Sequence, residues 1–209
     1  MRDRWRNRAE TEPGQGTIYW HILLQDKPNA LALAREAQER LSSVPGLHMT
    51  PRERLHITTL LVGSADSSSS EQTARMLEET RRTLAGVQPV GITLGHILYH
   101  PEAIMLGVHP QRALDPILNG VRAGMRHALG EEGTINGAFP SWTPHITVAY
   151  STTDQAAAPI IDILGRELPT CTVLIDAVSL VVQWGPERLW DWQTIGTIRL
   201  TPRTSYPKT

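Results

Sequence analysis

Hydrophobic positions recur with two periods along this chain, and the period-two runs predict strands. These runs are rich in β-branched and aromatic residues and are bounded by Gly, Pro, Asn or Ser, as strands usually are. They cover residues 17–24, 54–62, 90–99, 103–108, 144–150, 172–183 and 189–200. The runs at 90–99 and 103–108 flank His100-Pro101 and therefore predict a hairpin. The last two runs predict closing strands joined by a turn at Gly185-Pro186.

Between these runs, apolar residues spaced three and four apart predict helices. One opens at Pro28-Asn29, with Asn29 as the expected N-cap, and a third spans Arg112 to Leu129. A second begins after Ser68 and Glu71, which have the spacing of a capping box, and continues to about residue 85. Asp154 is the expected N-cap of a fourth helix that ends near residue 165.

The order strand, helix, strand, helix, strand occurs twice, from Thr17 to Tyr99 and from Ala103 to Gln183. This repetition predicts an internal duplication in which equivalent strands meet about a pseudo-two-fold axis. Strands interleaved with helices also fit a parallel, doubly wound sheet. However, no Gly-rich phosphate loop follows any of the predicted strands.

The chain has 209 residues, of which 40% are hydrophobic, so it is long enough for one large domain or two small lobes. We expect an N-terminal tail at 1–16, a single bilobal domain at 17–200 and a C-terminal tail at 201–209. Four arginines surround Trp5 in the first of these tails: Arg2, Arg4, Arg6 and Arg8. Such a segment could contact RNA or an acidic surface, but the simpler expectation is a solvated, frayed tail.

A net charge of −1 argues against a broad electrostatic footprint on long nucleic acid. A small substrate, an RNA end or a locally basic cleft remains compatible with this charge. Cys171 is the single cysteine, which excludes an internal disulfide and fits a reducing compartment. No apolar stretch is long enough to span a bilayer. We therefore expect a cytoplasmic monomer with no membrane partner.

Two segments read almost alike: Leu55-His56-Ile57-Thr58 and Pro144-His145-Ile146-Thr147. Successive side chains of a strand point to opposite faces, so each His shares a face with the Thr two residues later. A third triplet, His48-Met49-Thr50, lies between Pro-Gly and Pro and predicts a turn instead. If the two strands lie together, two imidazoles and two hydroxyls converge on one cleft. That set supplies a base, an acid and hydrogen-bond donors for breaking a phosphodiester. Alternatively, each His is a hydrogen-bonded core residue.

The two motifs resemble those of the 2H phosphoesterase superfamily, which includes bacterial 2'-5' RNA ligase-like proteins and 2',3'-cyclic phosphodiesterases. The resemblance implies a duplicated, bilobal α+β fold, with two antiparallel sheets around a central cleft and helices packed outside. It implies that His56 and His145 transfer protons while Thr58 and Thr147 hold the non-bridging oxygens. The implied reaction opens a 2',3'-cyclic phosphate or acts on a 2'-5' linkage, reversibly, in an RNA end or a small nucleotide. It requires no cofactor and no metal.

In the ligase-like branch, the second motif often continues to an Arg five residues after the His, whereas this chain has Tyr150 there. Strict alternation points Tyr150 away from His145 unless the strand bulges. Three other residues are candidates for substrate binding: Arg54 beside the first motif, Trp142 before the second, and Tyr19. Trp142 either stacks on a base or packs in the core. Tyr19 shares a strand face with His21 that either borders the cleft or packs against a helix.

Two further functional classes stay open from the sequence. A non-catalytic module could bind nucleotides or RNA ends in the same cleft, although binding alone does not require two proton carriers. A metal hydrolase could hold zinc with His56 and His145, although no Cys or carboxylate lies near either motif in the sequence.

Overall fold

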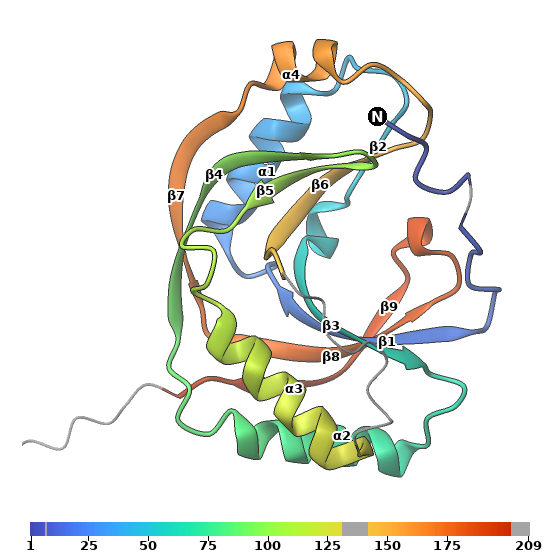
Figure 1. Ribbon diagram of the computed structural model, residues 1–209, viewed down its shortest axis with the longest axis vertical. Helices are drawn as coiled ribbons and strands as arrows, with labels where there is room; N and C mark the ends of the chain where they lie inside the picture. The colour runs from blue at the N-terminus through green and yellow to red at the C-terminus, as the bar shows by residue number, and fades with distance from the viewer. Residues whose placement is uncertain (7, 131–141, 202–209) are drawn as a thin grey trace, which may run out of the picture.

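The computed structural model describes residues 1–6, 8–130 and 142–201. The strands of this part of the chain are β1 Gly16–Leu23, β2 Leu47–Met49, β3 His56–Ser64, β4 Val90–His100, β5 Ala103–Gly107, β6 His145–Ser151, β7 Glu167–Ile175, β8 Ala177–Trp184 and β9 Trp192–Arg199. They form two sheets, which Figure 1 shows one above the other. One has four strands in the order β3-β1-β8-β9, and the other has five in the order β2-β6-β5-β4-β7. Every pairing is antiparallel, which rules out the doubly wound alternative.

The helices cover the outer faces of the two sheets, as the α+β expectation requires (Figure 1). Their bounds are α1 Pro28–Arg40, α2 Ser70–Thr83, α3 Asp115–Leu129 and α4 Ala158–Leu164. The α2–α3 pair contacts β9 and β3 of the four-stranded sheet, whereas α1 contacts β6 and β7 of the other sheet and α4 contacts α1. Among the described residues, no helix combines the length and the hydropathy needed to cross a membrane.

The expected duplication is present in the strand order. The order β3-β1-β8-β9 in one sheet is matched by β6-β5-β4-β7 in the other, so β3 corresponds to β6 and β1 to β5. The two halves also exchange elements. The first half ends in β4, which pairs with β5 of the second sheet, and the second half continues into β8, which pairs with β1 of the first sheet. The lobes are therefore interlocked, and the two His-bearing strands occupy equivalent places.

The core packs these helices closely against the sheets. Trp20 of β1 is fully buried, and its indole N–H donates to the sulfur of Met125 in α3 at 3.1 Å. The two helices of the α2–α3 pair touch at Gly124, where an added Cβ would lie 2.4 Å from the Cα of Thr80. Only glycine permits this backbone approach, so Gly124 sets the distance between α2 and α3.

Two expected helix starts are wrong. The N-cap of α1 is Lys27, because Pro28 occupies the first helical position, where a missing N–H costs nothing. Asn29 instead donates from its side chain to the carbonyl of Thr172. Helix α4 begins four residues after Asp154 and has no side-chain cap. Asp154 accepts a hydrogen bond from the backbone N–H of Asp3 at 3.0 Å.

The capping box of α2 lies one residue later than expected. Ser69 accepts from the N–H of Gln72 at 3.1 Å, and the Gln72 side chain accepts from the N–H of Ser69 at 2.8 Å. The pairing of Ser68 with Glu71 is therefore wrong. Four consecutive serines at 67–70 offer several registers for the same motif, so sequence alone does not select one.

Two further expectations about strands are wrong. The run 172–183 is not one strand, because the chain crosses between the sheets at Asp176, which separates β7 from β8. Its carboxylate binds the ammonium of Lys27 at 2.7 Å. The triplet at His48 is not a turn: it belongs to β2, where His48 pairs with Tyr150 at the edge of the five-stranded sheet.

The first residues of the chain are docked rather than frayed, so the expectation of a solvated N-terminal tail is wrong for the described residues 1–6 and 8. The backbone N–H of Arg2 donates to the carbonyl of Pro101 at 2.6 Å, and that of Arg4 donates to the carbonyl of Ser151 at 2.9 Å. In Figure 1 this segment descends from beside β2 toward the four-stranded sheet. Most of the expected C-terminal tail, residues 202–209, lies outside the described residues.

Candidate active site

His56 and His145 occupy matching places as the first residues of β3 and β6. The Nδ1 atom of His56 lies 2.7 Å from the carbonyl oxygen of Arg54, and that of His145 lies 2.8 Å from the carbonyl oxygen of Thr143. A carbonyl only accepts, so Nδ1 carries the hydrogen in both rings and Nε2 of the neutral ring carries the lone pair. No described residue hydrogen-bonds either Nε2 atom, so both remain available to a ligand.

The two motifs are brought together where the sheets meet. Strands β3 and β6 contact each other across the two sheets. The indole N–H of Trp142, three residues before His145, donates to the carbonyl of Thr58 at 3.1 Å. The positive charge of a protonated His145 also lowers the pKa of His56, which places the two rings within electrostatic range. Trp142 thus joins the two motifs through the backbone, and its ring packs against the main core cluster.

Both His-bearing strands bulge at the same place, three residues after the His. In the β1–β3 pair, Trp20 opposes Leu60 and His21 opposes Thr58, so Thr59 is left over. In the β5–β6 pair, Ile104 opposes Ala149 and Met105 opposes Thr147, so Val148 is left over. A bulge inserts one extra residue, so the residues after it reverse their alternation between the two faces of the sheet. The residue five positions after each His therefore shares its face.

This bulge corrects the expected direction of Tyr150. Its side chain lies on the same side of β6 as that of Thr147, which acts on the pKa of Tyr150. The ring is buried and stacks on Trp190 of the β8–β9 connection at 5.9 Å between centroids. The guanidinium carbon of Arg4 lies 4.6 Å from the centre of the same ring. Tyr150 therefore faces the site rather than away from it.

An aromatic wall encloses His56 on the side of the four-stranded sheet. The His21 ring lies 4.2 Å from the His56 ring between centroids, and the edge of Trp192 meets it at 4.8 Å and 88°. Tyr19 stacks on His21 at 5.1 Å. The strand face that carries Tyr19 and His21 thus borders the site, which settles the alternative left open by the sequence. On β5, the residue that corresponds to His21 is Met105.

The surroundings lower the pKa values of all three site histidines, His21, His56 and His145. Burial lowers the pKa of His56 to about 4; the hydrogen bond to Arg54 opposes this shift, and the charge of His145 adds to it. Burial also lowers the pKa of His145, against the hydrogen bond to Thr143 and with a further lowering from Arg4. The pKa of His21 lies well below its usual range for the same reason, burial, reinforced by the charge of His56. Near neutral pH the free site therefore holds neutral imidazoles.

The Arg54 side chain contacts Trp192. Its Nη1 donates to the carbonyl of Trp192 at 3.2 Å, and its guanidinium lies over the Trp192 ring at 5.3 Å. Sequence reasoning missed Arg4 and Glu187 as neighbours of the site. The alternation of arginines around Trp5 does not single out Arg4, because Arg2, Arg6 and Arg8 are exposed.

The described parts of the chain hold no group of three or more His, Cys, Asp or Glu side chains arranged to bind a metal ion. Cys171 is half-buried, its sulfur lies 3.6 Å from the carbonyl of Asn29, and burial raises its pKa. These features fit a packed residue rather than a thiolate nucleophile.

Solved structures share this fold at low identity. The structure of TT0787 from Thermus thermophilus has a TM-score of 0.70 at 20% identity, with 89% of this chain and 98% of that chain covered. E. coli LigT complexed with NADP+ has a TM-score of 0.68 at 15% identity, covering 91% and 99%. The MHV ns2 PDE domain has a TM-score of 0.59 at 11% identity, covering 79% and 98%. No curated protein sequence matches the chain significantly.

Residues 27–187 match the model of the family described as the 2'-5' RNA ligase superfamily. This range includes both His-x-Thr motifs, the strands that carry them and Trp142, which joins them. Together with the interlocked two-sheet fold, it confirms the resemblance to the 2H phosphoesterases. The chain belongs to the 2'-5' RNA ligase superfamily.

Proposed function

We propose that this protein is a metal-independent phosphoesterase that opens 2',3'-cyclic phosphates, or acts on 2'-5' linkages, at an RNA end or in a small nucleotide. The observation that carries the proposal is the matched pair His56 and His145, each with a free Nε2 and a Thr on the same strand face. Structures of E. coli LigT were solved with 3'-AMP, ATP and NADP+, which fits a nucleotide as the ligand here. We also expect a cytoplasmic monomer.

We assign the general base to His56 and the general acid to His145. His56 is the more strongly held in its neutral form, since burial brings its pKa to about 4. His145 lies on the side where Met105 replaces His21, and its pKa is lowered less strongly. The negative charge of a bound phosphodiester raises the pKa of a nearby imidazole, so substrate binding favours protonation of His145.

The reaction then balances without further groups. Nε2 of His56 takes a proton from a water that attacks phosphorus in line, and the P–O bond to one ribose oxygen breaks. Nε2–H of His145 gives its proton to that oxygen. The hydroxyls of Thr58 and Thr147 donate to the non-bridging oxygens as their charge increases. In ligation, a 5'-hydroxyl takes the place of the water, and His56 and His145 keep these roles. They exchange roles in the reverse reaction, in which a ribose hydroxyl attacks the 2'-5' phosphodiester and the 5'-oxygen leaves.

One assay panel tests the proposal against its alternatives. Cyclic mononucleotides, RNA with a cyclic end and 2'-5' oligonucleotides are each incubated with the protein, with and without EDTA. Turnover that survives EDTA supports the proposed function. Turnover abolished by EDTA and restored by a divalent metal would indicate a metal hydrolase. Tight nucleotide binding with no turnover of any substrate would indicate a binding module.

A further inference from the structure

The N-terminal segment crosses from one lobe to the other beside the two histidines. Its backbone docks on the five-stranded sheet through the carbonyls of Pro101 and Ser151. Farther along, Glu10 accepts from Arg188, which follows β8, at 2.9 Å. This segment lies outside residues 27–187, the range that matches the family model. The family resemblance therefore does not account for it.

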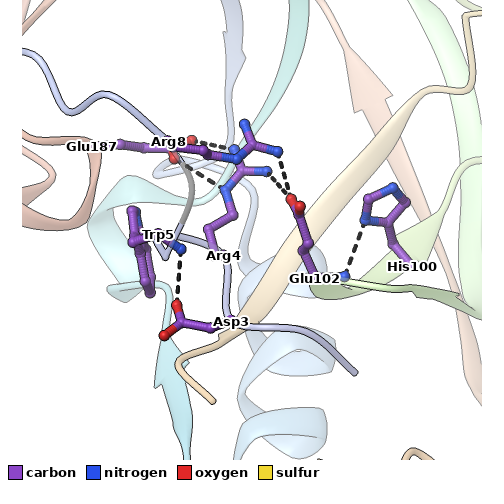
Figure 2. Close-up of polar contacts among 7 residues, drawn as sticks. All are labelled: Asp3, Arg4, Trp5, Arg8, His100, Glu102 and Glu187. Atoms are coloured by element: carbon purple, nitrogen blue, oxygen red, sulfur yellow. Dashed lines mark hydrogen bonds and ion pairs between the residues drawn. The ribbon is translucent and has the colours of Figure 1, made fainter. Parts of the chain in front are cut away.

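Arg4 is the fixed point of this segment. Its Nε and Nη2 donate to the two carboxylate oxygens of Glu187 at 3.1 and 2.7 Å, and its Nη1 donates to Glu102 at 3.1 Å (Figure 2). One glutamate comes from each lobe, so Arg4 bridges them. Its side chain is only 16% exposed. A guanidinium has five N–H groups, and two of those on Arg4 have no partner among the described residues.

A cavity of about 290 Å³ opens along the outer side of Arg4. Its lining consists of four arginines and three carboxylates: Arg2, Arg4, Arg6 and Arg8 with Asp3, Glu102 and Asp154. Glu187 balances the charge of Arg4 from outside this lining. The exposed side chain of Arg2 has no polar partner within the described ranges. Arg6 pairs with Asp154 at an exposed position, where water screens the pair and its contribution to stability is small. A phosphate, which an arginine can bind with two parallel hydrogen bonds, can therefore compete for Arg6.

The cavity adjoins the proposed active site through Arg4. One face of its guanidinium lies on the ring of Tyr150, which shares a strand face with Thr147 of the second motif. The charge of Arg4 also acts on His145. An anion in the cavity would thus be connected to the second motif through Arg4 and Tyr150.

We propose, on the basis of the proposed function, that this cavity binds a second phosphate of the substrate, one that flanks the scissile phosphate in an oligonucleotide. Arg4 fixes the wall between the two sites, and Arg2 and Arg6 provide the exchangeable contacts. The substrate class that follows is an RNA strand with a 2',3'-cyclic end, in preference to a cyclic mononucleotide. The Arg-rich segment is then a substrate-binding element rather than a tail.

The double variant Arg2→Gln with Arg6→Gln tests this directly, since it leaves Arg4 and both of its glutamates in place. We measure kcat/KM for a cyclic mononucleotide and for a short oligoribonucleotide with the same cyclic end. Loss of the charged phosphate contacts of Arg2 and Arg6 predicts a decrease of at least roughly ten-fold on the oligonucleotide. The mononucleotide value stays within about two-fold, and the salt dependence on the oligonucleotide becomes shallower. The control variant Arg35→Gln with Arg81→Gln, on exposed helix positions, changes neither value.

Equal losses on both substrates, or no loss on the oligonucleotide, would overturn the proposal. If the wild-type protein turns over neither substrate, the proposed function fails, and the cavity is then tested by binding. Fluorescence anisotropy of a labelled oligonucleotide that ends in a 3'-phosphate compares the wild-type protein with the Arg2/Arg6 variant. Weaker binding by that variant would support the cavity without the reaction, and equal binding would reject it.

Discussion

Burial of His56 beneath an aromatic wall makes a specific prediction for Trp192→Leu. The edge of the Trp192 ring meets the His56 ring at 4.8 Å, and Trp192 itself is only 8% exposed. Burial lowers the pKa of His56 from 6.5 to about 4. This lowering corresponds to about 3 kcal/mol in favour of the neutral ring. Replacing the indole by the smaller leucine admits water to one face of His56, so we expect its pKa to rise by at least about one unit.

The assay is an NMR titration of the His56 Cε1–H signal, together with the acid limb of the pH profile of kcat/KM. Both move toward higher pH in Trp192→Leu by the same amount, because this profile reports the pKa values of the free enzyme. Trp184→Leu serves as the control, because Trp184 is a half-buried tryptophan for which no ring contact with His56 is found among the described residues. A wild-type His56 that titrates near 6.5, or a folded Trp192→Leu variant whose His56 still titrates near 4, would refute the reasoning.

Three other perturbations follow from the same structure. Between their native pKa values and 6.5, the site histidines bind fewer protons in the native state than in the unfolded state. The free energy of unfolding therefore rises with pH across that window and decreases as pH falls toward 4. Urea unfolding at pH 7 and 4.5 measures the difference. Gln38→Leu removes the donor that bonds the carbonyl of Val148 at 2.9 Å, so we expect a loss of about 1–3 kcal/mol in urea unfolding and a lower kcat as the bulge of β6 relaxes. Gly124→Ala places a methyl group 2.4 Å from the Cα of Thr80. We expect a fall in Tm equivalent to about 1–3 kcal/mol, and an unchanged Tm would contradict the packing of α2 on α3.

The free-enzyme pKa values also determine where the reaction is fastest. The proposed productive form has a neutral His56 and a protonated His145. The pH range of high kcat/KM is therefore expected to begin near pH 4 and to end at the pKa of His145, below 6.5. The optimum of kcat/KM is therefore expected on the acid side of neutral. A profile that is flat from pH 5 to 8 would contradict the assignment of the two histidines as base and acid.

The sequence predicted the parts of the site that depend on local geometry. His56 and Thr58 share a face because the period of a strand is two residues, and this holds without any tertiary contact. The direction of Tyr150 was not predictable in this way. It depends on the bulge at Val148, whose carbonyl is held by Gln38 of α1, more than a hundred residues away. Alternation in the sequence contains no sign of such a contact.

The position of the N-terminal segment also depends on contacts between residues that are distant in the sequence. Arg4 is ordered by Glu102 and Glu187, which lie 98 and 183 residues away. A run of arginines without these partners is indistinguishable from a solvated tail. Sequence analysis therefore predicted the fold class and the two proposed proton carriers, while the contacts around them required the three-dimensional structure.

The pairing of the two motifs in one reaction is tested most directly by kcat/KM for cyclic-phosphate opening in His56→Asn, His145→Asn and the double variant. Removing either proton carrier is expected to cost on the order of 10²- to 10⁴-fold. The double variant is expected to be little slower than the worse single variant, because the two imidazoles act as a unit. A folded single variant with wild-type turnover, or losses that simply multiply in the double variant, would contradict a shared site.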